Sequence, residues 1–211
     1  MTANTYGESA ELSGMSDQER RIVSAAQRLF IEKGYSETSM SDIAAEAGIN
    51  RSALHYYFRT KEKMFQAVFG DIIVSVVPAV HDVIVSDRPF PERLEKIVDM
   101  YMGIFIENPG LPSFVIRELA RDSAHLVSTA KSLGIAEYGC RIVEDLTSEM
   151  DSGSLRRVPL DTVFNTFYGL LLFPFLSGGL FFRIFPGGTS CACLDDWKHN
   201  IVSQMSHLLL P

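Results

Sequence analysis

Between residues 17 and 58 the apolar side chains repeat with the spacing of an α-helix, and glycines divide that repeat into short pieces. A stripe at i, i+3, i+4 and i+7 runs over residues 17–33 and stops at Gly34, a residue type that tolerates the left-handed conformation at helix ends. Gly48 then separates two much shorter apolar patterns. Two short helices joined by a turn that contains glycine form a helix-turn-helix. The spacing therefore predicts three N-terminal helices, of which the last two form that motif.

Capping residues stand where these helices would begin. A Ser, Thr, Asp or Asn before a helix accepts a hydrogen bond from a free backbone N–H, and Ser39 with Asp42 has the spacing of a capping box. The expected caps are Ser16 or Asp17 for the helix that ends at Lys33, Ser39 for a second helix that stops at Gly48, Asn50 for Arg51 to about Phe58, and Thr60 for a long helix from Lys61 to about Val85, with Pro78 inside it.

The rest of the chain also has helical periodicity, without a sustained alternation of apolar and polar residues. Further helices are expected over residues 92–107, 113–121, 126–150, 160–173 and 194–210, with a bend at Pro174. The predicted fold is all-α. Residues 1–15 are expected to be a disordered leader, residues 16–62 a helix-turn-helix domain, and residues 63–211 a helical domain; the family resemblance given below implies that the former binds DNA and that the latter binds an effector and forms the dimer.

The charge is acidic overall but not along the whole chain. The net charge is −7 for 211 residues, whereas residues 51–63 hold four basic side chains against Glu62 alone. Phosphate contacts from Lys and Arg dominate non-specific DNA affinity. The local excess therefore favours DNA contact by this segment, with modest affinity for each copy of the chain.

The block from Arg20 to Phe69 resembles the N-terminal domain of TetR-family regulators. The residues that carry this resemblance are Leu29-Phe30, Lys33-Gly34-Tyr35, Thr38-Ser39-Met40-Ser41-Asp42-Ile43-Ala44, Ala47-Gly48-Ile49, Leu54-His55-Tyr56-Tyr57-Phe58 and Lys61-Glu62-Lys63-Met64-Phe65. His55 and Tyr57 stand where the family often has Tyr and His, respectively. The resemblance implies a one-component transcriptional repressor that is an all-helical homodimer.

A recognition helix places its first residues near base edges in the major groove. Arg51 can bond guanine O6 and N7, Ala53 suits a thymine methyl, and Ser52 can bond a base or phosphate. His55 is one turn further on. The candidate phosphate contacts, which position the helix without reading sequence, are Tyr56, Tyr57, Lys61, Thr38 and Ser39.

In the resembled family the last two helices form a four-helix dimer interface. The candidate interface residues here are Phe164, Tyr168, Leu171, Phe175, Trp197, Ile201, Met205 and Leu208. A symmetric dimer would present two recognition helices about one DNA turn apart, ~34 Å, to a palindromic operator.

The family's ligand pocket lies among the middle helices. The candidate lining residues are Met100, Tyr101, Ile104, Phe105, Phe114, Arg117, Tyr138 and Phe167, of which most are expected to be ordinary core. Arg117 would orient an anionic group or pair with a nearby carboxylate. We expect a small, largely apolar effector that shifts the spacing of the two DNA-binding heads, with the long fourth helix transmitting the change.

Other classes fit less well. No catalytic or nucleotide-binding motif is present, and no cofactor or metal is expected. A thiolate site of Cys191, Cys193, Asp195, Asp196 and His199 matches no strong metal pattern. The uncharged run Val163–Phe182 is long enough to span a bilayer, but its polar residues favour a buried or dimer-forming helix. We expect a cytoplasmic protein; an activator or a nucleoid-type DNA binder remains an alternative to a repressor.

Overall fold

The computed structural model describes residues 15–177, 184 and 194–211, and these residues contain helices and no strand. The predicted all-α class is confirmed. The chain divides into two compact units. The first comprises Met1–Pro78 and Phe114–Ala136, and the second comprises Ala79–Ser113 and Glu137–Pro211. The predicted leader, residues 1–15, lies almost entirely outside the described residues.

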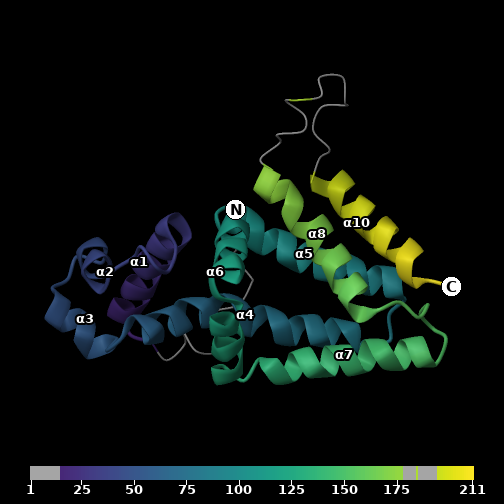
Figure 1. Ribbon diagram of the computed structural model, residues 1–211, viewed down its shortest axis with the longest axis horizontal. Coiled ribbons are helices and arrows are strands. Elements are labelled where there is room, and N and C mark those ends of the chain that lie inside the picture. Colours follow the sequence, from purple (N-terminus) through teal and green to yellow (C-terminus); the bar gives the residue numbers. More distant parts are fainter. Residues whose placement is uncertain (1–14, 178–183, 185–193) are drawn as a thin grey trace. The chain divides into compact units, whose positions relative to one another are not determined.

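The first unit begins with the three predicted helices, α1 (Asp17–Lys33), α2 (Met40–Glu46) and α3 (Arg51–Tyr57). Ser16 and Glu19 form a capping box at α1, and Ser39 and Asp42 form another at α2. Figure 1 shows α1, α2 and α3 grouped together, with α2 packed against both of the other helices. Each boundary follows from local backbone chemistry, since caps satisfy the free N–H groups of a helix start. Gly48, at φ +69°, makes the turn between α2 and α3.

The same unit contains the start of α4 (Lys61–Ile84) and most of α6 (Leu111–Ser132). Phe65 of α4 is fully buried, and its ring meets Phe30 of α1 and Phe114 of α6 at centroid distances of 5.8 and 6.1 Å. This aromatic core joins α6 to the N-terminal helices. Residues 114–136 therefore belong to the same compact unit as the helix-turn-helix. The sequence had predicted a domain boundary at residue 62, which placed them in the C-terminal domain.

The second unit is built from the end of α4, α5 (Phe90–Glu107), α7 (Ala136–Asp151), α8 (Leu160–Ser177) and α10 (Leu194–Leu209). The last helix packs on α5 and on α8. Its inward side chains Ile201, Met205 and Leu209 are almost completely buried. The apolar stripe of α10 thus supplies the core of this unit, although Ile201 and Met205 were predicted to face a partner chain.

Two predicted helix boundaries were wrong. The break expected after residue 121 lies at Asp122, whose angles are non-helical, but the helix expected over 126–150 is divided, since α6 ends at Ser132 and α7 begins at Ala136. Gly134 takes φ +71° between them, and its N–H and that of Ile135 close the end of α6 on Lys131 and Ala130. Further along the chain, α8 continues through Pro174 to Ser177, so the expected bend at that proline does not end the helix.

Candidate nucleic-acid interface

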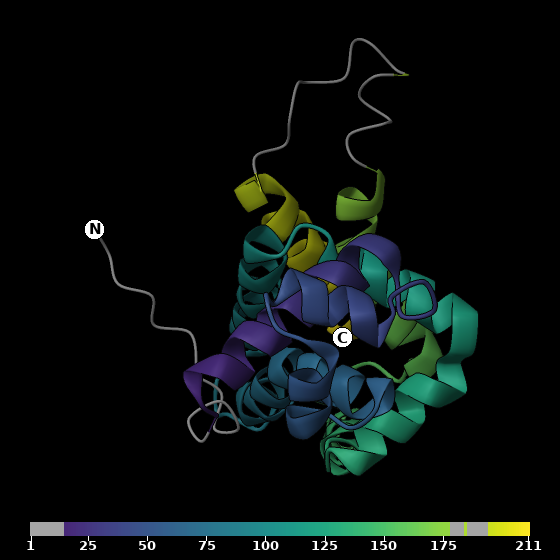
Figure 2. The same ribbon diagram turned by 90° about the vertical axis from the view of Figure 1, so that its left-hand side faces the viewer.

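The third helix presents its first turn to solvent. The Asn50 side chain accepts the N–H of Ala53 at 2.8 Å, and Leu54 on the opposite side is fully buried. Arg51 and Ser52 are exposed. Figure 2 brings this group of helices, purple to blue, to the front of the view. The cap and the buried leucine fix α3 while leaving the side chains of its first turn available to a groove, which is what a recognition helix requires.

Arg51 and His55 lie one turn apart and are paired. The Arg51 Nε donates to His55 Nε2 at 3.4 Å, and His55 Nδ1 lies 3.2 Å from the carbonyl oxygen of Arg59. Because a carbonyl only accepts, the proton on a neutral His55 is assigned to Nδ1, which leaves Nε2 to accept from Arg51. The pair keeps the guanidinium close to the outer face of α3, where it can exchange the imidazole for a base edge.

The two tyrosines of α3 differ in exposure. Tyr56 is 83% exposed, whereas Tyr57 is half-buried, and their rings meet edge to face at 5.2 Å. An exposed phenol next to an exposed arginine can donate its hydroxyl to a phosphate oxygen. Tyr57 supports the ring of Tyr56 rather than extending as far into solvent.

The first residue of α4 is held in place by the loop after α1. Lys61 Nζ donates to the carbonyl of Ser36 at 3.1 Å and lies 4.4 Å from the centre of the Tyr35 ring. Partial burial lowers the pKa of Lys61 from its ordinary value, and the positive charge of Arg121 acts in the same direction. A cation at the start of a helix adds to the positive end of the helix dipole, so this position favours an anion.

The structure corrects one predicted phosphate contact. The Thr38 hydroxyl donates to the carbonyls of Leu29 and Gly34 at 3.2 and 2.9 Å, and only 1% of the residue is exposed. Because this hydroxyl closes the end of α1, it is not available to DNA. Ser39 is exposed, but its hydroxyl and its N–H both donate to Asp42 at 2.6 and 2.8 Å.

Comparison with known proteins agrees with this geometry. Residues 22–68 match the model of the bacterial regulatory proteins of the tetR family. Over these residues the chain is similar to the regulators of the tetR family. The nucleoid occlusion factor SlmA of Mannheimia succiniciproducens is 30% identical over 107 residues, which cover 49% of this chain and 50% of SlmA. The regulator EthR of Mycolicibacterium smegmatis is 29% identical over 102 residues, which cover 48% of this chain and 46% of EthR.

The chain thus spans about half the length of the curated relatives it matches. Among solved structures, HlyIIR, a hemolysin II transcriptional regulator, has a TM-score of 0.65 at 21% identity, covering 89% of this chain and 96% of HlyIIR. That likeness shows the shared fold. These relatives and this neighbour are named as a nucleoid occlusion factor and as transcriptional regulators, in agreement with the prediction that the chain is not an enzyme.

The predicted effector residues are divided between the two units. Phe114 and Arg117 belong to the first unit, and the others belong to the second. In the second unit, the Tyr101 and Tyr168 hydroxyls lie 3.0 Å apart, and Phe105 and Phe167 pack beside Tyr101. Met100, Ile104 and Tyr138 are half-buried. Burial raises the pKa of Tyr101 well above its ordinary value, and the contact with Tyr168 raises it further.

Arg117 does not have the predicted role within its unit. Its guanidinium donates to the carbonyl oxygens of Ile31 and Glu32 in the last turn of α1, and the residue is exposed. The free carbonyls of a helix end attract a cation. Arg117 therefore attaches α6 to α1, and it forms neither the expected pair with a carboxylate nor the expected wall of an apolar pocket.

The predicted dimer residues include several that already form the core. Leu171, Ile201 and Met205 are almost completely buried within one chain, so they are not the surface that a partner would cover. Phe164, Phe175, Trp197 and Leu208 are half-buried, and the Trp197 indole donates to the Leu170 carbonyl at 3.0 Å. The predictions for Leu171, Ile201 and Met205 were wrong because a helix with apolar residues on every side packs one stripe of them against the core of its own chain.

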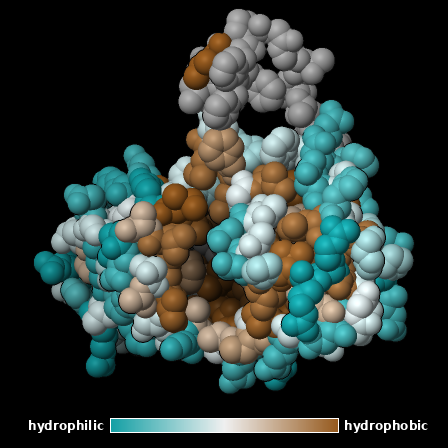
Figure 3. All heavy atoms as spheres, turned by 45° about the vertical axis from the view of Figure 1, so that its right-hand side comes forward, coloured by the Kyte–Doolittle hydropathy of each residue, from teal (hydrophilic) through white to brown (hydrophobic). Residues whose placement is uncertain are grey.

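Another part of α8 remains exposed. Tyr168, Phe173 and Leu176 are 39%, 52% and 37% exposed. Figure 3 shows apolar side chains gathered on the side of the molecule that faces the viewer. Within the described part of the chain, α8 also has the length and hydropathy to cross a membrane, and only 17% of it is buried. Cys191 and Cys193 lie outside the described residues, and nothing is described of the Asp195 side chain.

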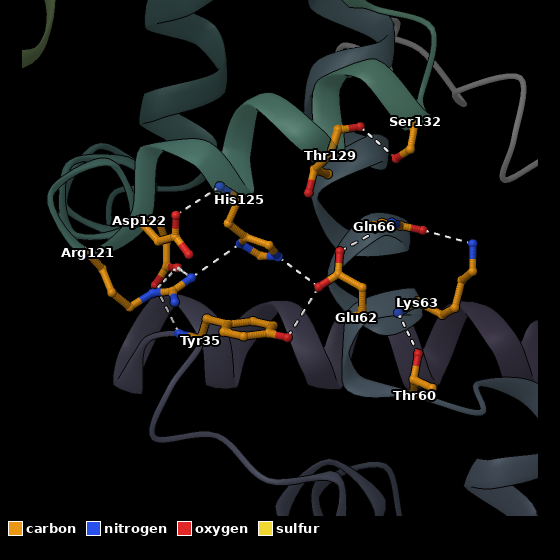
Figure 4. A network of polar contacts seen from close by, with 11 residues as sticks. Tyr35, Thr60, Glu62, Lys63, Gln66, Arg121, Asp122, His125, Thr129 and Ser132 are labelled. Carbon is orange, nitrogen blue, oxygen red and sulfur yellow. Dashed lines mark hydrogen bonds and ion pairs between the residues drawn. The ribbon is translucent and has the colours of Figure 1, made fainter.

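Sequence reasoning missed a polar group on α6. Glu118 and Arg121 contact Tyr35. His125 contacts Glu62, and Figure 4 shows Arg121 and His125 beside Tyr35 and Glu62. Glu118, Arg121 and His125 are spaced at i, i+3 and i+7, the spacing of one face of an unbroken helix, although α6 has non-helical angles at Asp122. This polar stripe could have indicated a buried polar contact, although not with which residues.

Proposed function

We propose that this chain is a sequence-specific DNA-binding transcriptional regulator, acting as a homodimeric repressor that a small, largely apolar effector releases from a palindromic operator. The observation that carries the proposal is the first turn of α3, where Arg51 and Ser52 are exposed while Leu54 and the Asn50 cap hold the helix in place. Arg51 is the candidate for bidentate contact with a guanine, and Ser52 and Ala53 are candidates for neighbouring base edges.

Phosphate contacts would orient this helix. Tyr56 extends into solvent, Lys61 stands at the start of α4, and Ser39 stands at the start of α2. Tyr57 and His55 would support them at the edge of α3. Such contacts position a protein on the duplex without selecting sequence, and they make the affinity strongly dependent on salt.

Dimer formation is supported by the exposed apolar residues of α8. A soluble protein gains free energy by burying such a surface, and a second copy of the same helix is the partner that gives a closed, symmetric assembly. A two-fold dimer would carry two copies of α3, and the operator would then have two matching half-sites.

Effector release is supported by the aromatic cluster around Tyr101. Two tyrosine hydroxyls within an apolar surrounding suit a mainly apolar molecule with one hydrogen-bonding group. An effector would act by binding better to the conformation that does not fit the operator, and it can shift the equilibrium only by its differential affinity.

Selection of bound duplexes from a random pool tests the DNA-binding proposal. We expect one palindromic consensus and a complex of two chains. We expect Arg51→Ala to weaken binding to the selected site by roughly tenfold or more, since a bidentate contact with guanine discriminates by ~1–3 kcal/mol. Lys63→Ala, a nearby exposed lysine outside α3, serves as the matched control and should leave the consensus unchanged. Binding without salt dependence, or no binding to any duplex, would refute the proposal.

The match to SlmA supports one alternative, a nucleoid-associated role in which the same interface binds many chromosomal sites. The same selection separates the two functions when it is followed by mapping of bound sites on the chromosome. A few sites next to promoters support the repressor, whereas many dispersed sites support the nucleoid role.

A further inference from the structure

The candidate phosphate contact Lys61 and the helix α6 meet at one aromatic ring. The Tyr35 ring centre lies 4.4 Å from Lys61 Nζ and 4.9 Å from the guanidinium carbon of Arg121. Both distances are within the ~6 Å at which a cation is attracted to an aromatic face. Tyr35 is therefore the residue through which a side chain of α6 reaches the start of α4.

A buried carboxylate fixes that arrangement. Glu118, of which only 2% is exposed, accepts the backbone N–H of Tyr35 at 3.0 Å and the Nε of Arg121 at 2.8 Å. A buried carboxylate must be paired, and these two donors pair it. The Tyr35 backbone and the Arg121 side chain are thus held by the same residue of α6.

The next turn of α6 holds the neighbour of Lys61. His125 Nε2 lies 2.7 Å from Glu62 Oε2, an oxygen that also accepts the Tyr35 hydroxyl at 3.3 Å (Figure 4). On its other side, His125 Nδ1 lies 3.2 Å from a guanidinium nitrogen of Arg121. Arginine can only donate, so Nδ1 accepts and Nε2 carries the proton that it donates to Glu62.

A break in α6 orients this histidine. Asp122 has non-helical angles, φ −160° and ψ 85°, and its carboxylate accepts the N–H of His125 at 3.0 Å. This is the geometry of an N-cap, which fixes the first turn of the segment that follows. His125 lies in that turn, and its ring is 4.8 Å from the Phe65 ring. The backbone and the ring of His125 are therefore both held in place.

We propose, resting on the proposed DNA-binding function, that His125 is a positioning residue for the phosphate contact made by Lys61. By holding the Glu62 carboxylate against Tyr35, His125 keeps this negative charge from pairing with its neighbour Lys61 or turning toward the DNA backbone. A carboxylate at the start of α4 would repel phosphate oxygens, and one that paired with Lys61 would compete with them. The His125 contact therefore keeps the Glu62 carboxylate away from Lys61, whose ammonium has three donors and can bind phosphate in addition to the Ser36 carbonyl.

A double-mutant cycle tests this role, because the coupling of two residues distinguishes positioning from a general structural effect. The probe is a fluorescently labelled duplex of random sequence at low salt, and the readout is fluorescence anisotropy with the full-length dimer. His125→Phe keeps a ring beside Phe65 but removes the donor to Glu62. Combined with Lys61→Ala, it forms the test pair. Combined with Lys63→Ala, which removes a lysine from the same turn, it forms the matched control.

We expect His125→Phe to weaken binding by about threefold to tenfold in the wild-type background and in Lys63→Ala, but by less than about twofold in Lys61→Ala. His125→Gln, whose amide can still donate to Glu62, should restore most of the loss. Circular dichroism melting verifies that each variant is folded. If His125→Phe does not melt cooperatively, the smaller His125→Leu takes its place in the cycle.

An equal loss in all three backgrounds would overturn the positioning role, as would an unchanged affinity of His125→Phe or of Lys61→Ala. These results leave the proposed function intact as long as the wild-type protein binds the duplex in a salt-dependent manner. If the wild-type protein shows no such binding, the proposed DNA-binding function is refuted, and the positioning role, which rests on it, is refuted as well.

Discussion

Arg93 at the start of α5 and Glu149 near the end of α7 form a two-bonded ion pair, with both nitrogen–oxygen distances at 2.6 Å. Only 9% of Arg93 is exposed. The same guanidinium also donates to the carbonyl of Ile84, the last residue of α4. One side chain therefore joins three helix ends of the second unit, and two of them are carboxyl-terminal ends that favour a cation.

Removal of only one partner should strongly destabilise this unit. We expect Arg93→Met to lower the free energy of unfolding by about 3–5 kcal/mol, because Glu149 would remain as an uncompensated, partly buried charge. Replacing both partners, Arg93→Met with Glu149→Leu, should cost distinctly less. Urea unfolding monitored by circular dichroism measures both variants. Equal losses for the single and the double replacement would show that the ion pair itself, and not the orphaned carboxylate, dominates.

The N-cap of the recognition helix should make a measurable contribution to the free energy of unfolding. Asn50→Ala removes the acceptor of the Ala53 N–H, and we expect it to reduce the free energy of unfolding by about 1 kcal/mol. Asn50→Asp keeps an oxygen at the same place and is the matched control, with little expected loss. Thermal melting of the two variants checks the prediction, and a similar loss for both would attribute the effect to something other than the cap.

The paired tyrosines should make the protein less stable at high pH. Burial raises the pKa values of Tyr101 and Tyr168 above their ordinary value, so the unfolded chain ionises first. Their contribution to stability is complete below the unfolded pKa of ~10 and is lost as the pH rises toward the folded values. Tyr101→Phe should lose less stability than the wild type across this range. Denaturation at several pH values measures it, and parallel curves for the two proteins would contradict it.

The exposed side of α8 should control the oligomeric state. We expect Leu176→Lys to shift the protein from dimer to monomer in analytical ultracentrifugation, because a charge buried without a partner in an apolar interface is costly. Val143→Lys, on the exposed face of α7, is a control of similar exposure and should leave the assembly unchanged. A Leu176→Lys protein that stays dimeric at low micromolar concentration would place the interface elsewhere.

The N-terminal helices could be predicted closely because their signals are local. Ser39, Asn50 and Gly48 act on backbone groups within about four residues, and such effects can be read from adjacent sequence positions. The start and end of α1 agree with the prediction for the same reason. Where a local signal was overlooked, as at Gly134, the predicted boundary between α6 and α7 was wrong.

Which stripe of α8 and α10 faces the core could not be read in this way. Both helices carry apolar residues on more than one side, so the sequence predicted Leu171 and Ile201 as interface residues together with the exposed Tyr168. Their burial depends on how α10 packs on α5 and α8, which is a property of the assembled helices.

Contacts between residues far apart in the sequence could not be predicted either. Arg93 and Glu149 are 56 positions apart, and Glu62 and His125 are 63 positions apart. Local amino-acid order sets where each helix begins and ends, since those boundaries depend on hydrogen bonds and side chains one turn away. Partners across helices are selected only when the whole chain packs, because each contact depends on the placement of every helix between them.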